Sequence, residues 1–172
     1  YTVRADDAYV QGDDSLSVSI SGTAGGAFET LSLAGTVATT VTDDADASTV
    51  TLSSASAATV SEGGSVVYTA SVNNPVTGSD LTVTLSNGQT LTIPVGQSTA
   101  SVTYTVRADD AYVQGDDSLS VTIAGTAGGA FESLSLAGTV ATTVTDDADA
   151  STVTLSSASA ATDRKSGRLD SS

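Results

Sequence analysis

Apolar and polar residues alternate with a period of two along most of this chain. The alternation forms short runs bounded by Gly, Asn, Asp and Pro, which predicts seven or eight strands in about 100 residues. The runs cover residues 49–53, 66–71, 81–85, 91–93, 102–106, 119–123 and 134–145. No segment sustains an apolar period of 3.6 residues, so no helix is predicted. Strands with one apolar face each require two sheets over one core, which predicts an all-β, antiparallel, immunoglobulin-like β-sandwich.

Two connections carry specific turn signals. The dipeptide Asn87-Gly88 predicts a two-residue hairpin with a type I′ turn, because that turn needs positive φ at both central positions. The glycine-rich segment 125–131 lacks the strand–loop–helix context of a phosphate loop and is interpreted as a long connection between strands. Residues 60–64 are interpreted as a turn before the next strand.

The chain repeats itself with a period of 103 residues. Residues 1–59 recur as residues 104–162, and the two copies differ only at Ser19/Thr122, Ser21/Ala124 and Thr30/Ser133. A period of this length corresponds to one small domain per repeat. We therefore expect four segments. Residues 1–47 are the C-terminal half of a truncated repeat, residues 48–150 are a complete sandwich repeat and residues 151–162 are the first strand of a third repeat. Residues 163–172 are a non-repeat tail, which is interpreted as an artefact.

Composition excludes several function classes. The 172 residues include 20 acids against 5 Lys and Arg, and neither His nor Cys. This excludes His- or Cys-dependent catalysis, zinc fingers, haem and iron–sulfur centres. The acidity argues against nucleic acid or an anionic membrane as a partner, and no apolar run is long enough for membrane insertion. We expect no enzyme, because no acid lies in a segment whose pattern suggests a buried cleft.

The acids gather at predicted strand ends and junctions, while the strand faces carry Thr and Ser. The acids that do so in the complete repeat are Glu62, Asp109, Asp110, Asp116, Asp117, Asp146, Asp147 and Asp149, and those of the first copy are Asp6, Asp7, Asp13, Asp14, Asp43, Asp44 and Asp46. Alternate strand ends of a sandwich share a pole, so these carboxylates are expected to converge. A hard cation relieves their repulsion, and Ca²⁺ accepts six to eight oxygen ligands in flexible geometry. The pattern favours a Ca²⁺ site at the interdomain pole over a merely solvated acidic surface.

The acids form none of the common calcium loops. Residues 44–48 begin like an EF-hand, but Ala55 stands where that loop needs its Glu. Of the two junctions, 43–48 is favoured over 146–151, because the tail replaces the equivalent of Glu62 in the third copy. Arg4 and Arg107 lie beside the Asp pairs and are expected to pair locally, with little effect on stability if exposed.

Several motifs in fixed order carry a family resemblance. They are Val60-Ser-Glu-Gly-Gly64, Tyr68-Thr-Ala70, Ile93-Pro-Val-Gly96, Asp109-Asp-Ala-Tyr-Val-Gln-Gly115-Asp-Asp-Ser-Leu and Thr145-Asp-Asp147. Over residues 1–162 the chain looks like a Calx-beta-type calcium-binding sandwich. With its near-identical units, it resembles still more closely the Ca²⁺-dependent extender repeats of large RTX-type bacterial adhesins, including biofilm adhesins.

The resemblance implies a structural role outside the cell. It implies a spacer on the bacterial cell surface in which Ca²⁺ rigidifies domains and linkers, with the acids named above as ligands. The partners are then neighbouring repeats of the same chain, and any host or surface ligand is bound by another domain. Two alternatives remain. One is a glycan- or ligand-binding adhesion module using Tyr112 and Phe131, which we rather expect to be packing anchors. The other is a Calx-beta-type Ca²⁺ sensor, against which the near-identical copies argue.

Overall fold

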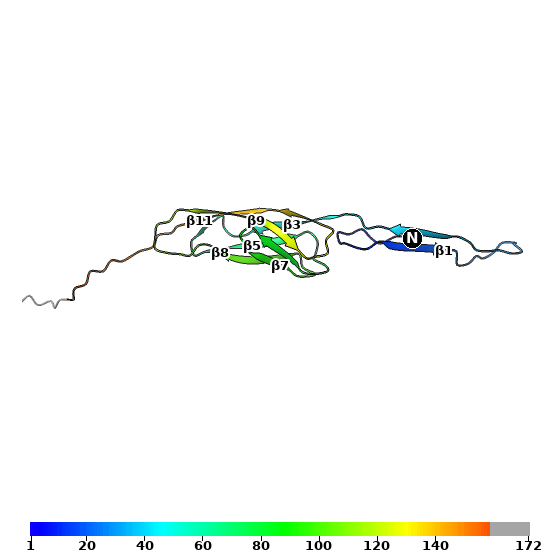
Figure 1. Cartoon of the computed structure of the whole chain (residues 1–172), viewed down its shortest axis with the longest axis horizontal. Helices are drawn as coiled ribbons and strands as arrows, with labels where there is room; N and C mark the ends of the chain where they lie inside the picture. Colours follow the sequence, from blue (N-terminus) through cyan, green and yellow to red (C-terminus); the bar gives the residue numbers. More distant parts are fainter. Residues whose placement is uncertain (159–172) are drawn as a thin grey trace, which may run out of the picture.

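The computed structural model describes residues 1–158; the predicted tail at 163–172 lies outside the described residues. All regular structure in the described part is β, with no helix. Figure 1 shows an elongated molecule in which a β-sandwich and an N-terminal hairpin lie end to end. The prediction of an all-β sandwich is therefore confirmed.

The sandwich consists of two sheets with the strand orders β10-β3-β5-β8 and β4-β11-β9-β6-β7. Most neighbours are antiparallel, whereas β3 with β10 and β4 with β11 are parallel. The strands are β3 (Ala47–Ser54), β4 (Thr59–Ser61), β5 (Ser65–Val72), β6 (Leu81–Leu85), β7 (Thr90–Ile93), β8 (Thr99–Thr105), β9 (Asp117–Ala127), β10 (Ser133–Ala137) and β11 (Thr139–Thr145).

The core follows the alternation in the sequence. Every second residue of β5 is buried, from Val66 through Tyr68 and Ala70 to Val72. Strands β3, β6 and β7 contribute fully or almost fully buried side chains in the same way, so their predicted inner faces are confirmed. Leu136 differs because β10 is an edge strand that pairs only with β3, and this side chain remains 43% exposed.

The chain changes sheets at two places that the sequence pattern did not reveal. The run predicted over 134–145 is broken at Gly138, so that β10 joins one sheet and β11 the other. Gly138 has φ +91°, and a Cβ there would lie 2.2 Å from the carbonyl oxygen of Leu52. The predicted turn at 60–64 overlaps the short strand β4, which pairs with β11 and brings the next residue, Glu62, beside the end of β11.

Two turn predictions need correction. The hairpin between β6 and β7 exists, but its predicted type I′ turn is wrong, because Gly88 has positive φ (83°) and Asn87 does not. The Gly88 N–H donates to the Leu85 carbonyl (3.0 Å). This hydrogen bond closes a type I turn, and Gly88 follows its two central residues in the left-handed conformation. The loop predicted at 125–131 is shorter, because β9 continues to Ala127 by pairing with β6.

The first copy keeps only part of this fold. Strands β1 (Asp14–Ser19) and β2 (Thr36–Val41) pair in the register of β9 and β11, shifted by 103 residues. Residues 30–34 correspond to β10 but form no strand. Residues 151–158, predicted as part of a first strand, are exposed and form none either, and 159–162 lie outside the described residues. A strand needs partners for its backbone groups, and the corresponding partner strands are not in this chain.

Candidate cation sites

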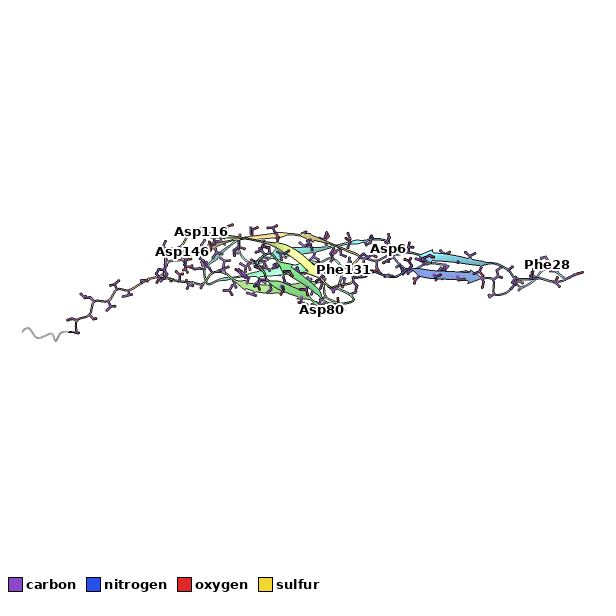
Figure 2. All side chains as sticks on the ribbon, in the orientation of Figure 1. Asp6, Phe28, Asp80, Asp116, Phe131 and Asp146 are labelled. Carbon is purple, nitrogen blue, oxygen red and sulfur yellow. The ribbon has the colours of Figure 1, made fainter. Side chains whose placement is uncertain are left out.

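One end of the sandwich collects carboxylates from three strand ends. Glu62 follows β4, Asp109 lies beyond β8 and Asp147 lies beyond β11. Their carboxylates each offer an oxygen, and these three atoms all lie within 4.8 Å of one another. Figure 2 places Asp146 and Asp116 at this end of the sandwich and Phe131 and Asp80 at the other. We call Glu62, Asp109 and Asp147 the terminal cluster.

Backbone contacts hold the three strand ends together. The Glu62 N–H donates to the Thr145 carbonyl (3.0 Å), and the Gly63 N–H donates to the Arg107 carbonyl (2.8 Å). Gly63 has φ +71°, and a Cβ on it would lie 2.9 Å from the Cβ of Asp109. Glycine at this position therefore lets Asp109 approach the turn that carries Glu62.

Glu62 is the buried member of the terminal cluster. Its side chain has no exposed surface, and its Oε2 accepts a hydrogen bond from Arg107 Nε at 3.1 Å. Its Oε1 is buried and has no hydrogen-bond partner in the described part of the chain. Burial raises the pKa of Glu62, the hydrogen bond from Arg107 lowers it, and contact with Asp146 raises it again. This carboxylate therefore keeps one oxygen free for a further ligand.

Arg107 supplies the cation that balances Glu62. Its side chain is 18% exposed, and it also contacts the Gly115 carbonyl (2.7 Å), Asp117 (3.0 Å) and, at 3.9 Å, Asp146. The expectation of local pairing is confirmed. The Glu62 pair is buried, however, so the small contribution expected of an exposed pair does not apply to it.

Asp109 faces negative charges and forms no ion pair with a cationic side chain of the described residues. The charges of Asp149 and Asp147 raise its pKa, with a smaller contribution from burial. Asp149 thus acts on the terminal cluster from the segment that follows β11. The terminal cluster is anionic despite Arg107, and a cation bound there would reduce the repulsion among its carboxylates.

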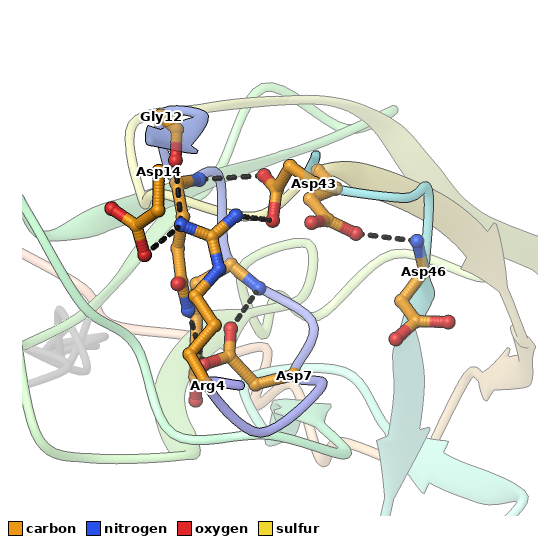
Figure 3. Close-up of polar contacts among 9 residues, drawn as sticks. Arg4, Asp7, Gly12, Asp14, Asp43 and Asp46 are labelled. Atoms are coloured by element: carbon orange, nitrogen blue, oxygen red, sulfur yellow. Dashed lines mark hydrogen bonds and ion pairs between the residues drawn. The ribbon is translucent and has the colours of Figure 1, made fainter. Parts of the chain in front are cut away.

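The first copy forms a second group at the junction with the sandwich, which we call the junction cluster. It consists of Asp6, Asp44 and Asp46, again with one oxygen each within 4.8 Å. The Asp44 carboxylate raises the pKa of Asp6, because it accepts a hydrogen bond from the protonated form of Asp6 and its negative charge disfavours ionisation. Arg4 contacts the Gly12 carbonyl, Asp14 (3.3 Å) and Asp43 (3.2 Å), as Figure 3 shows.

The reason for favouring 43–48 over 146–151 is wrong. Glu62 belongs to the same repeat as Asp109 and Asp147 and meets them at the end of that repeat. The 146–149 end therefore has its glutamate. The equivalent partner of the junction cluster would lie 103 residues before Glu62, at a position that this chain does not contain.

Four predicted site residues shape the loops instead of joining either cluster. Asp7 accepts the backbone N–H of Tyr9, and Asp110 accepts that of Tyr112 (2.8 Å). Asp43 accepts the backbone N–H of Gln11, and Asp146 accepts that of Gln114, in the same two loops. These carboxylates set the course of the loops from which the cluster residues project.

The remaining predicted residues lie around the clusters. Asp14 and Asp117 form ion pairs with Arg4 and Arg107 and are well exposed. Asp13 and Asp116 are exposed and belong to neither cluster.

Sequence reasoning missed Glu132, at the opposite end of the sandwich. Its Oε2 accepts the backbone N–H of Asp46, and its Oε1 is buried without a hydrogen-bond partner among the described residues. That hydrogen bond lowers the pKa of Glu132, but burial and the charge of Asp43 raise it, and the net shift is upward. Glu132 stands alone after a glycine-rich segment, so no run of acids marked it.

One protein-family model matches this chain, over the complete repeat and not over the first copy. The model of the LapA domain family matches residues 46–148. No curated protein and no solved structure matches the chain. The matched region spans β3 to β11 and includes all three residues of the terminal cluster.

Proposed function

Because the chain belongs to the LapA domain family, we propose that it is a Ca²⁺-stabilised extender repeat of a bacterial surface adhesin of the RTX type. Its units are immunoglobulin-like sandwiches in tandem, and Ca²⁺ rigidifies them at the interdomain junctions. The LapA domain is associated with a family of cell-surface adhesion proteins, which supports an extracellular location. None of the described segments is a helix long and apolar enough to cross a membrane.

The buried carboxylate of Glu62 carries this proposal. A buried carboxylate oxygen without a partner is costly, and here it lies beside Asp109 and Asp147 in an anionic cluster. A cation bound among the three would supply the missing contact and offset the repulsion that raises the pKa of Asp109. The exposed acids elsewhere need no such explanation, because water solvates them.

The ligand atoms favour Ca²⁺ among the common divalent ions. All candidate ligands are oxygens, which suit hard cations. Ca²⁺ binds oxygen at about 2.3–2.6 Å, so two ligands on opposite sides of the ion lie roughly 5 Å apart. The three oxygens lie within 4.8 Å of one another, which is compatible with ligands of a single Ca²⁺. Mg²⁺ demands a near-octahedral ligand set and usually keeps several waters, so carboxylates from three separate strand ends suit the flexible geometry of Ca²⁺ better.

The same ion would stiffen the array. Asp149 and its equivalent Asp46 lie in the segments that leave a repeat, so a cation held at these acids would tie that segment to the strand ends. A ligand that binds only the folded state stabilises it by RT ln(1 + [L]/Kd). With Kd near 10⁻⁴–10⁻³ M, typical of extracellular modules, 10 mM Ca²⁺ contributes about 1.4–2.7 kcal/mol per site.

The test is thermal unfolding of the full chain in EDTA and in 10 mM Ca²⁺, with 10 mM Mg²⁺ as the ion control. We expect Ca²⁺ to raise the Tm of the sandwich by roughly 5–20 °C. Asp109→Asn removes one ligand and one repelling charge. It should leave the Tm in EDTA equal or higher, and abolish most of the Ca²⁺ response.

The matched control is Asp116→Asn, which removes an exposed acid outside the cluster. This variant should keep the full Ca²⁺ response. The proposal is wrong if the unchanged chain shows no Ca²⁺ response, or if Asp109→Asn and Asp116→Asn respond alike.

A further inference from the structure

The first copy docks onto the sandwich through a short backbone pairing. The Val10 N–H donates to the Ala130 carbonyl (2.9 Å), and the Glu132 N–H donates to the Ala8 carbonyl (3.3 Å). Between them, Tyr9 and Phe131 form an antiparallel β-bridge. Residues 8–10 and 130–132 therefore make a joint whose hydrogen bonds run from one copy to the next.

Side chains reinforce this joint through contacts additional to the hydrogen bond from the Asp46 N–H to Glu132. The rings of Tyr9 and Phe131 lie 5.6 Å apart, centroid to centroid, with a tilt of 37°. The Tyr9 hydroxyl donates to the Pro75 carbonyl at 2.6 Å. Phe131 in turn packs against the core of the sandwich, so the ring of Tyr9 continues that packing across the joint. Figure 2 shows Phe131 on the side of the sandwich that faces the first copy.

The other end of the sandwich presents the same residues without an occupant. Residues 111–113 have the sequence of residues 8–10, but Tyr112 is 78% exposed and Val113 is 99% exposed. A hollow of about 330 Å³ lies between residues 111–113 and 146–149. The equivalent walls in the first copy, 8–10 and 43–46, receive residues 130–132 through the contacts just described.

We propose that Tyr112, Val113 and the adjoining hollow are a docking surface for the Phe131-bearing loop of a further copy of this repeat. The identical residues of the first copy already hold such a loop. Residues 148–162 have the sequence of residues 45–59, so the sequence of a further copy begins directly after the hollow. The exposure of Tyr112 and Val113 is then explained, because together they form one half of a joint whose other half belongs to the next copy.

Most contacts of this joint involve no carboxylate, because they are aromatic packing, a tyrosine hydroxyl and two backbone hydrogen bonds. The hydrogen bond from the Asp46 N–H to Glu132 also crosses the joint, and Asp46 belongs to the junction cluster, so the joint lies next to a proposed cation site. The array would thus have two means of holding adjacent repeats in line, and measurements in EDTA isolate the one proposed here.

The first experiment measures amide hydrogen exchange by NMR on the full chain in EDTA. The Val10 and Glu132 amides report opening of the joint, because each donates across it. Tyr9→Ala removes the aromatic pair and should raise exchange at both amides by about threefold to tenfold. Tyr112→Ala is the matched control, since the same change at the exposed equivalent should leave both amides unaffected.

The second experiment gives the surface its proposed occupant. In an extended chain, residues 1–150 are followed by a second copy of residues 48–150. The Val113 amide should exchange much more slowly in this chain than in the original one, and Tyr112→Ala should restore fast exchange. Unchanged exchange at Val113 in the extended chain overturns the proposal, as does an unaffected joint in Tyr9→Ala. Specific binding of an oligosaccharide that Tyr112→Ala abolishes would assign the surface to glycan recognition instead, and would also overturn it.

Discussion

Replacing Gly138 by alanine should destabilise the sandwich strongly. Gly138 lies where the chain leaves the sheet of β10 and enters the sheet of β11, and it directs β11 toward the terminal cluster. At its φ of +91° an L side chain is strained, at a cost of about 1–2 kcal/mol. The new Cβ would also lie 2.2 Å from the Leu52 carbonyl oxygen and 2.9 Å from the Leu52 nitrogen.

The steric part of the cost is large because both neighbours are backbone atoms of β3. They cannot rotate away, so the strand must shift, which costs typically about 1–3 kcal/mol. The sum is about 2–5 kcal/mol, and each kcal/mol lowers the Tm of a domain of this size by roughly 4–8 °C. We therefore expect Gly138→Ala to lower the Tm of the sandwich by at least about 8 °C.

The first copy supplies a matched control at Gly35. Its φ is +97°, but a Cβ there meets nothing within 4 Å. Gly35→Ala should leave the Tm of the sandwich unchanged, as measured by circular dichroism and by urea midpoints on the same preparations. If both variants lose the same stability, or if Gly138→Ala loses less than about 1 kcal/mol, the close approach to Leu52 does not determine this crossing.

Two further predictions concern the charged groups. Replacing Arg107 by Met leaves buried Glu62 without its cation, so the sandwich should lose stability, and it should lose more at pH 8 than at pH 5. Arg4→Met is the control, and it should cost less than about 1 kcal/mol at both pH values because the partners of Arg4 are more exposed. An equal, pH-independent loss in thermal melts of the two variants would contradict this prediction. In the folded state the pKa of Asp109 lies above its ordinary value of 3.8 and the pKa of Glu62 lies above 4.5, so the folded state holds more protons than the unfolded state. In EDTA the Tm should therefore fall as the pH rises through the range above those values, and with Ca²⁺ the fall should be smaller. A metal-free Tm that rises over that range would refute the charge repulsion inferred for the terminal cluster.

Local patterns predicted much of the fold because a strand with one buried face records its burial in its own sequence. The alternation around Val50, Tyr68 and Leu81 identified their inward faces correctly. Strand β4 escaped detection because three residues are too few for a periodic signal. The break at Gly138 escaped because both of the strands it separates continue the same alternation.

The turn at Asn87-Gly88 shows a second limit. The dipeptide correctly marked a hairpin, but the turn type depends on how the strands are paired. Because Thr84 pairs with Thr90, Gly88 takes the left-handed position and Asn87 does not need to. Sequence alone leaves both turns available to the same residues.

The candidate sites divide in the same way. Acids at strand ends were visible in the sequence, and so was their expected convergence. Which acids converge was not, because Asp109 and Asp110 are adjacent in sequence but only Asp109 belongs to the terminal cluster, while Asp110 accepts the Tyr112 N–H. Glu132 was invisible because its role comes from contact with Asp46, 86 residues away.

By itself, then, the sequence determined most of the strands, the repeat of 103 residues and the surplus of acids at strand ends, because each is a local or periodic property. The tertiary structure decided which carboxylates meet and that Glu62 among them is buried, because these depend on pairing between distant strands. It also decided the different states of Tyr9 and Tyr112. Their sequence surroundings are nearly the same, yet one packs on Phe131 and the other is exposed, because a contact requires a partner at the right place.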